Sequence, residues 1–312
     1  MKTGTIEKVL KKKLTEWLET ITDETLRRDV KDGLLVSGGS IASMLLGEKV
    51  NDFDIYLSNM DLVKRVAEYY LQPFDKDCVF VIDGREKEKH LKEIERKYAD
   101  GIEHDNSFVV PIRTLKENQI KIFVVGGGGY AVEGEKKPAE KGKYLPLYFS
   151  PNAITLSDDL QIVLRFYGSA KEIHETFDFV HATNYFTFKD GLVTNVRALE
   201  CLLTKTLIYQ GSHYPLTSII RTKKFLKRGF RISAGEYLKM MFQISQLNLQ
   251  DVDTLEEQLI GVDVAYFATL IQILRSKYSS DENFYLTTEY LNTLIDRVFN
   301  SAGDEEDNNE YA

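Results

Sequence analysis

The sequence predicts an α+β fold, in which a mixed sheet with flanking helices is followed by an all-helical domain. Between residues 34 and 166, short apolar runs of period two alternate with runs of helical period. From residue 193 to residue 299 the period is helical almost throughout. The length of 312 residues is about twice that of a typical single domain, which also favours two units.

The expected elements follow one another along the chain. Residues 5–21 carry apolar side chains at helical spacing, and Asp23 is placed to cap a second helix. Strands are expected at 34–36, 53–57, 78–82, 106–112, 119–125, 144–149, 153–156, 160–166 and 177–181, with helices at 41–46, 61–71, 86–98 and 170–176. The expected domains are therefore 1–190, which carries the sheet, and the helical 191–300, followed by an acidic tail at 301–312.

Composition narrows the class of protein. The net charge is -8, and five of the acidic residues lie in the tail, so the body is close to neutral. This balance argues against a nucleic-acid coat protein but allows one local basic patch. No apolar run approaches the roughly 18 residues that a membrane helix needs, and the Lys-rich start is unlike a signal peptide. With only Cys78 and Cys201, neither a disulfide framework nor a zinc site is expected, and the default setting is cytoplasmic.

The segment at residues 34–57, LLVSGGSIASMLLGEKVNDFDIYL, carries the clearest chemical signal. Gly38 and Gly39 let a ligand approach the backbone closely, and a helix that begins near Ser40 directs its positive end to the same place, which suits phosphate. Asp52 and Asp54 are two residues apart on an expected strand, so their carboxylates point together. Paired carboxylates bind hard cations such as Mg²⁺. Either pattern alone is common, but the two together at this spacing are far more specific.

This segment resembles the nucleotidyltransferases of the DNA polymerase β superfamily. The spacing is closest to the head domain of CCA-adding enzymes and bacterial-type poly(A) polymerases. The matching parts are Gly38-Gly39, Leu45-Leu46-Gly47 and Asp52-Phe53-Asp54. Ala42 and Ser43 stand where those families carry Arg-Asp, so CCA addition itself is not implied. The resemblance implies a nucleotidyltransferase-type sheet.

A second segment, at residues 160–188, resembles virus- and phage-encoded nucleotidyltransferases with the same head domain. There an apolar Q-I strand, a short helix and an F-D-F strand follow one another, as Gln161-Ile162 and Phe177-Asp178-Phe179 do here. By that resemblance Asp178 completes a triad with Asp52 and Asp54 that holds two magnesium ions. The alternative interpretation makes Asp178 a strand-end cap.

The resemblance implies a metal-dependent, template-independent enzyme of phage origin. It would move a nucleoside monophosphate from an NTP such as ATP to an acceptor hydroxyl, foremost an RNA 3′ end. Gly38, Gly39 and Ser40 would hold the phosphates. Two alternatives stay open: transfer to a protein or a small molecule, and a non-catalytic RNA-binding, partner-binding or virion module that kept the fold.

Residues 221–231 carry six positive charges. In one interpretation Lys224 and Arg228 contact the triphosphate or an RNA backbone. The alternative interpretation, which the sequence favours equally, is a solvated amphipathic helix with Phe225 and Leu226 buried. The glycines at 126–129 are expected to form a connection, because no Lys-Ser/Thr pair follows them.

Overall fold

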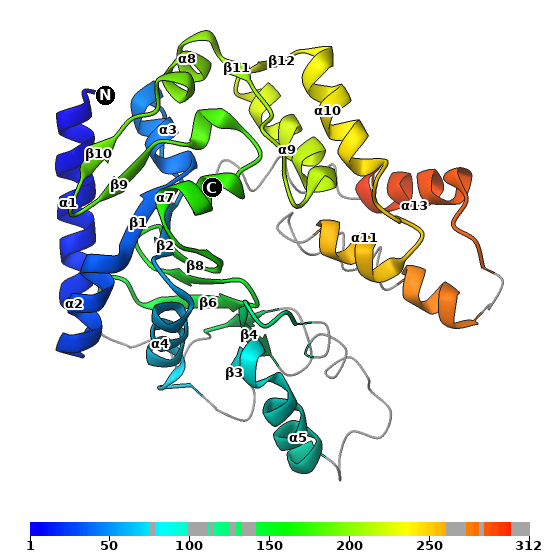
Figure 1. Ribbon diagram of the computed structural model, residues 1–312, viewed down its shortest axis with the longest axis horizontal. Coiled ribbons are helices and arrows are strands. Elements are labelled where there is room, and N and C mark those ends of the chain that lie inside the picture. Colours follow the sequence, from blue (N-terminus) through cyan, green and yellow to red (C-terminus); the bar gives the residue numbers. More distant parts are fainter. Residues whose placement is uncertain are drawn as a thin grey trace. The chain divides into compact units, whose positions relative to one another are not determined.

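The computed structural model describes residues 1–74, 79–98, 112, 115–124, 129–132, 142–259, 273–280 and 284–300. The chain divides into two compact units, Met1–Thr204 and Lys205–Ala312. The first unit holds a mixed sheet with flanking helices and the second is mainly helical (Figure 1). This confirms the predicted fold class.

Two helices precede the sheet. They are α1 (Thr3–Thr20) and α2 (Glu24–Gly33). Asp23 caps α2, because its side chain accepts a hydrogen bond from the backbone N–H of Leu26 at 2.9 Å. Ile6, Leu10 and Leu14 of α1 are four residues apart and buried, as are Trp17 and Leu18, whereas Val9 is 38% exposed. The buried stripe packs the helix into the main core.

The large sheet has eight strands in the order β10-β9-β1-β2-β8-β7-β6-β5. Their bounds are β1 (Leu34–Ser37), β2 (Phe53–Leu57), β5 (Tyr130–Ala131), β6 (Pro146–Ser150), β7 (Ala153–Leu156), β8 (Leu160–Tyr167), β9 (Tyr185–Thr187) and β10 (Gly191–Val193). Among the described strands of this sheet, β2 and β8 are the only neighbours that pair in parallel. The other elements of this unit are α3 (Gly39–Leu46), α4 (Met60–Leu71), η1 (Gly84–Glu86), α5 (Lys87–Tyr98), α7 (Ala170–Glu175), η3 (Val180–Ala182), α8 (Val196–Thr204) and the separate pair β3 (Val79–Asp83) and β4 (Ile120–Val124).

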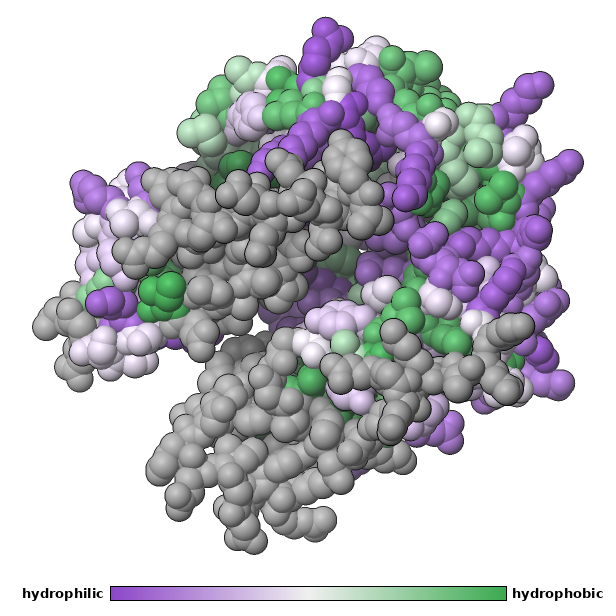
Figure 2. Space-filling view, turned by 180° about the vertical axis from the view of Figure 1, so that it is seen from behind, coloured by the Kyte–Doolittle hydropathy of each residue, from purple (hydrophilic) through white to green (hydrophobic). Residues whose placement is uncertain are grey.

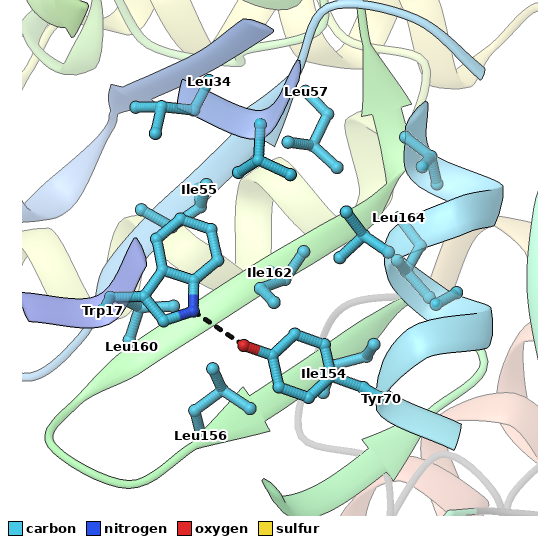
Figure 3. Packing of buried hydrophobic residues seen from close by; sticks show 14 of the residues in the cluster. Trp17, Leu34, Ile55, Leu57, Tyr70, Ile154, Leu156, Leu160, Ile162 and Leu164 are labelled. Atoms are coloured by element: carbon cyan, nitrogen blue, oxygen red, sulfur yellow. Dashed lines mark hydrogen bonds between the residues drawn. The ribbon is translucent and has the colours of Figure 1, made fainter. Parts of the chain in front are cut away.

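The main core lies between one face of the large sheet and the helices α1, α2 and α4. Alternate residues of β2 and β8, such as Ile55 and Ile162, are fully buried there beside Trp17 and Tyr70 (Figure 3). Trp17 Nε1 donates a hydrogen bond to Tyr70 Oη at 2.8 Å. The bond joins α1 to α4 and satisfies the only polar group of a side chain that has no exposed surface.

We expect Tyr70→Phe to lower the free energy of unfolding by about 1–3 kcal/mol, because it leaves the buried N–H of Trp17 without an acceptor. Urea denaturation followed by tryptophan fluorescence measures the change. Tyr285→Phe is the matched control, since the Tyr285 ring is 68% exposed. A loss equal to that of the control would show that the bond contributes nothing.

The structure differs from the sequence prediction around residues 177–181. This segment is not a strand: it passes through a bend at Asp178 and an isolated bridge at Phe179 into the 3-10 helix η3. Strands β9 and β10 were not predicted and extend the sheet beyond β1. The strand predicted at 106–112 lies outside the described residues except for Ile112, which is helical.

The second unit contains α9 (Pro215–Lys227), α10 (Ala234–Ile244), α11 (Val252–Leu259), a helix at 273–280 and α13 (Thr288–Asn300). It also contains one short parallel pair, β11 (Thr206–Leu207) with β12 (Arg231–Ile232), which the sequence did not predict. Leu255, Leu274 and Leu294 form its core. The predicted boundary at residue 190 precedes the division at Thr204, and the tail at 301–312 lies outside the described residues.

On the side of the molecule that holds α1 and α2, Figure 2 shows mainly hydrophilic residues. Lys11 of α1 is exposed, and its Nζ lies 2.6 Å from a carboxylate oxygen of Glu7. Within the described residues, no helix combines the length and the apolar character needed to cross a bilayer.

Candidate functional site

The glycine turn connects β1 to α3. Gly38 has φ 91° and ψ -144°, a conformation that only glycine adopts readily, and it forms the N-cap of α3. Its N–H donates to the carbonyl oxygen of Ala182 at 3.1 Å. The first N–H groups of a helix have no acceptor within the helix, so those of Gly39 and Ser40 are left for a ligand. The N–H of Gly38 is thus already bonded within the protein, and phosphate binding by Gly38, Gly39 and Ser40 stays a prediction.

The three residues of the turn differ in exposure. Gly39 is exposed, whereas Gly38 and Ser40 are buried. A Cβ added at Gly39 would meet no heavy atom of the described residues within 4 Å. Ser40 Oγ is buried and has no hydrogen-bond partner among the residues that the structure describes. Open space in front of Gly39 and an unsatisfied hydroxyl beside it are features of a binding site.

Asp54 lies directly beside this turn. Its Oδ2 is 3.5 Å from the position that a Cβ on Gly38 would take. Phe53 and Ile55 belong to the main core, so strand alternation places Asp54 on the opposite face of the sheet. Asp52 precedes β2 and is exposed. The strand thus brings one carboxylate to the glycine turn and leaves the second at the solvent boundary.

Asp178 lies in the segment that connects α7 to η3. Helix α7 covers a small apolar cluster of Leu35, Tyr56 and Ile173 on the sheet face that carries Asp54. The Phe177 ring, next to Asp178, lies 5.9 Å from that of Tyr56. Asp178 is itself 8% exposed, and the following residues lead into η3, whose Ala182 accepts the N–H of Gly38.

A buried polar cluster fixes these segments together. Ser37 Oγ lies 2.8 Å from the carbonyl oxygen of Asn184 and 2.9 Å from His174 Nε2. A hydroxyl has one proton to donate, so Ser37 donates to Asn184 and the Nε2–H of neutral His174 donates to Ser37. The cluster ties β1, α7 and the start of β9 at one point. Sequence analysis did not assign this role to His174, because Ser37 and His174 are 137 residues apart.

We expect the His174 cluster to make stability depend on pH. Burial lowers the pKa of His174 to about 4 from an ordinary value of 6.5. Between these values the unfolded chain binds a proton that the folded chain does not, so stability falls as the pH is lowered through this window. In urea denaturation at several pH values, His174→Gln should flatten this fall, whereas His213→Gln, at an exposed position, should not. Parallel curves for the two variants would contradict the assignment.

The donor set beside the turn fits a hard cation in its chemistry. Asp52 and Asp54 offer carboxylate oxygens, the ligands that Mg²⁺ prefers. Within the described residues, no three His, Cys, Asp or Glu side chains are grouped so that they could hold a metal ion. Metal binding by Asp52, Asp54 and Asp178 therefore stays a prediction.

The predicted basic residues lie in the second unit. Lys224 is exposed on α9, and Arg228 is the C-cap of that helix. Leu226 is 43% exposed, so the interpretation that buries it on an amphipathic helix is wrong for this residue. Contacts of Lys224 and Arg228 with a triphosphate or an RNA stay predictions.

A sequence model of the Gabija anti-defense 2 family protein matches residues 8–205, well over half of the chain. The chain belongs to the Gabija anti-defense 2 family. The matched range of this family includes the glycine turn, Asp52, Asp54 and Asp178, and it ends at the boundary of the first compact unit. No curated protein matches the chain.

Solved structures similar to this Gabija anti-defense 2 family chain include CCA-adding enzymes and a tRNA nucleotidyltransferase. The Thermotoga maritima CCA-adding enzyme complexed with tRNA is 15% identical with a TM-score of 0.35, over 88% of this chain and 57% of that one. The Bacillus stearothermophilus CCA-adding enzyme in complex with CTP is 12% identical with a TM-score of 0.35, over 83% and 51%. A tRNA nucleotidyltransferase complexed with a primer tRNA and an ATP analog is 15% identical with a TM-score of 0.31, over 80% and 57%. The chain thus matches little more than half the length of these enzymes. Similarities this low do not show its activity.

Proposed function

We propose that the protein is a metal-dependent, template-independent nucleotidyltransferase that moves a nucleoside monophosphate from an NTP to an acceptor hydroxyl. One observation carries the proposal: the Asp54 carboxylate lies beside a glycine turn at a helix start, with Oδ2 3.5 Å from the position that a Cβ on Gly38 would take. A phosphate bound at the turn would therefore stand next to a group that binds cations. Phosphoryl transfer requires this pairing of anion binding and cation binding.

The turn would hold the β- and γ-phosphates of the nucleotide. The N–H groups of Gly39 and Ser40 point out of the start of α3, where the helix dipole also favours negative charge. Gly38 contributes differently: its backbone conformation and its bond to Ala182 set the direction in which α3 begins. Ser40 Oγ is a further donor once a ligand reaches it.

Asp52, Asp54 and Asp178 are the proposed holders of magnesium. Magnesium bound there would lower the pKa of the acceptor hydroxyl and stabilise the charge of the leaving pyrophosphate. Asp54 is proposed because it lies beside the turn. Asp52 is proposed because it is two residues earlier in the chain. Asp178 is proposed because the segment that follows it reaches the end of β1, where Ala182 accepts the N–H of Gly38. No protein nucleophile is needed.

An RNA 3′ end is the first candidate acceptor. The exposed cations on and after α9, Lys224 among them, have the chemistry that binds a phosphate backbone, and Arg228 at the end of this helix would add to it. A protein acceptor is the second candidate, because the family description names a role in countering Gabija defence. Nucleotidyl transfer onto a component of that system would inactivate it covalently.

We expect Gly39→Val to weaken nucleotide binding strongly without harming the fold. Gly39 is helical and open space surrounds the new side chain, so the folded chain accepts it, but the valine methyl groups occupy the place of the phosphates. Calorimetric titration with magnesium and a non-hydrolysable NTP measures the loss, which we expect to be on the order of a hundredfold in Kd, the size of a few lost charge-assisted hydrogen bonds.

Gly4→Val is the matched control, because Gly4 also lies in the first turn of a helix with no described atom within 4 Å of an added Cβ. It should bind the nucleotide as the wild type does. Unchanged affinity in a folded Gly39→Val protein would mean that the turn is structural only.

A further inference from the structure

A row of polar side chains crosses the sheet on the face opposite the main core. In the parallel pair of β2 and β8, Asp54 is the register partner of Gln161. In the antiparallel pair of β7 and β8, Gln161 is the partner of Thr155. Register partners on adjacent strands lie about 4.8 Å apart and point to the same face. Asp54, Gln161 and Thr155 are therefore consecutive neighbours.

Burial confirms the face on which this row lies. Leu160 and Ile162, on either side of Gln161, are buried in the main core, as are Phe53 and Ile55 beside Asp54. Gln161, Asp54 and Thr155 are each half-buried. The three polar groups are thus partly open to solvent at the end of the sheet that carries the glycine turn.

The amide of Gln161 has a defined orientation. Its Nε2 donates to Thr155 Oγ1 at 3.4 Å, which directs the nitrogen toward β7. The carbonyl oxygen of an amide points away from its nitrogen, so Oε1 is left on the side of β2, where Asp54 lies. The glycine turn lies on the other side of Asp54. The carboxylate is therefore flanked by a phosphate-binding turn and by a neutral oxygen.

We propose that Gln161 Oε1 is a ligand of the metal ion that Asp54 holds, an inference that rests on the proposed function. Amide carbonyls bind the same hard cations as carboxylates do, such as Mg²⁺ and Mn²⁺. Gln161 adds an oxygen without adding a charge. The site then binds its ion less tightly than it would with a carboxylate at this position, because affinity for hard cations rises with the number of charged ligands.

The proposal predicts opposite effects for two substitutions of one residue. Gln161→Met keeps the length of the side chain and removes the oxygen, so it should weaken binding of Mn²⁺ on the order of tenfold, a typical cost of a lost metal partner. Gln161→Glu keeps the oxygen and adds a charge, so it should tighten binding by a similar factor. Loss of stability could not produce both results.

Electron paramagnetic resonance of free Mn²⁺, titrated into the full chain with a non-hydrolysable NTP, measures the affinity without any turnover. Gln246→Glu, exposed on the second unit, controls for the added charge and should bind as the wild type does. The proposal is overturned if Gln161→Met retains wild-type affinity, or if Gln161→Glu binds no more tightly than Gln246→Glu.

Asp54→Asn separates this inference from the proposed function. If Asp54→Asn loses Mn²⁺ and the Gln161 variants do not change affinity, only the role of Gln161 is wrong. If Asp54→Asn binds Mn²⁺ like the wild type, the metal site itself is misplaced and both proposals fail.

Discussion

Asp54→Asn should reduce NTP incorporation by a hundredfold or more while the protein stays folded. The substitution preserves the shape of a half-buried side chain but removes the charge that faces the glycine turn. Losing one charged group that acts on the transition state typically costs a few kcal/mol, which gives this factor in rate. Incorporation of a labelled NTP, measured under conditions where the nucleotide is saturating, reports the loss. Asp52→Asn should behave in the same way.

Asp32→Asn is the matched control, because Asp32 is exposed on α2, at the end of β1 away from the glycine turn. It should incorporate the NTP at the wild-type rate. Near-normal rates for both Asp54→Asn and Asp52→Asn would remove these residues from the catalytic site.

Gly38→Ala should impair both stability and activity. At φ 91° and ψ -144° an alanine is strained by about 1–3 kcal/mol, although the nearest atom to its Cβ, Asp54 Oδ2, is 3.5 Å away. Relief of the strain would turn the first N–H groups of α3 away from the phosphates. Misplacement of a positioned group by about 1 Å can cost on the order of a hundredfold in rate.

Gly211→Ala distinguishes the two effects. Gly211 also has a positive φ, of 105°, and the nearest described atom to an added Cβ is Gln243 Nε2 at 3.8 Å, but Gly211 lies in the second unit. Urea denaturation should show a loss of stability in both variants, whereas incorporation assays should show a loss of activity in Gly38→Ala alone. Equal activity in the two variants would contradict a role of the turn in binding phosphate.

The local part of the site was predictable from the sequence. The strand, glycine turn, short helix and second strand within residues 34–57 depend on signals a few residues apart, and the structure has them as β1, α3 and β2. Gly47 ends α3 in a left-handed conformation, as its place after Leu46 predicted. The direction of the Asp54 side chain, away from the main core, was predictable because side chains alternate along a strand with one buried face.

The partners that come from far along the chain were not predictable in this way. The pairing of Ser37 with Tyr185 and the bond from Gly38 to Ala182 join segments that share no local pattern. Alternation around Asp178 indicated a strand, but the bond to Gly38 and the packing of Phe179 favour a bend and a 3-10 helix there. Gln161 is beside Asp54 only because β8 pairs in parallel with β2, which is a property of the sheet and not of either strand.

The most direct test of nucleotidyl transfer is incorporation of α-labelled NTPs by the wild-type protein with magnesium, in parallel reactions that contain total RNA, cellular protein or no acceptor. The account predicts that label enters an acceptor fraction, that pyrophosphate is released in equal amount, and that chelation of the metal and Asp54→Asn both stop the reaction. Label in RNA supports the first candidate acceptor and label in protein supports the second. Absence of incorporation in every reaction, by a folded protein that binds neither metal nor nucleotide, would contradict the assignment of this site as catalytic.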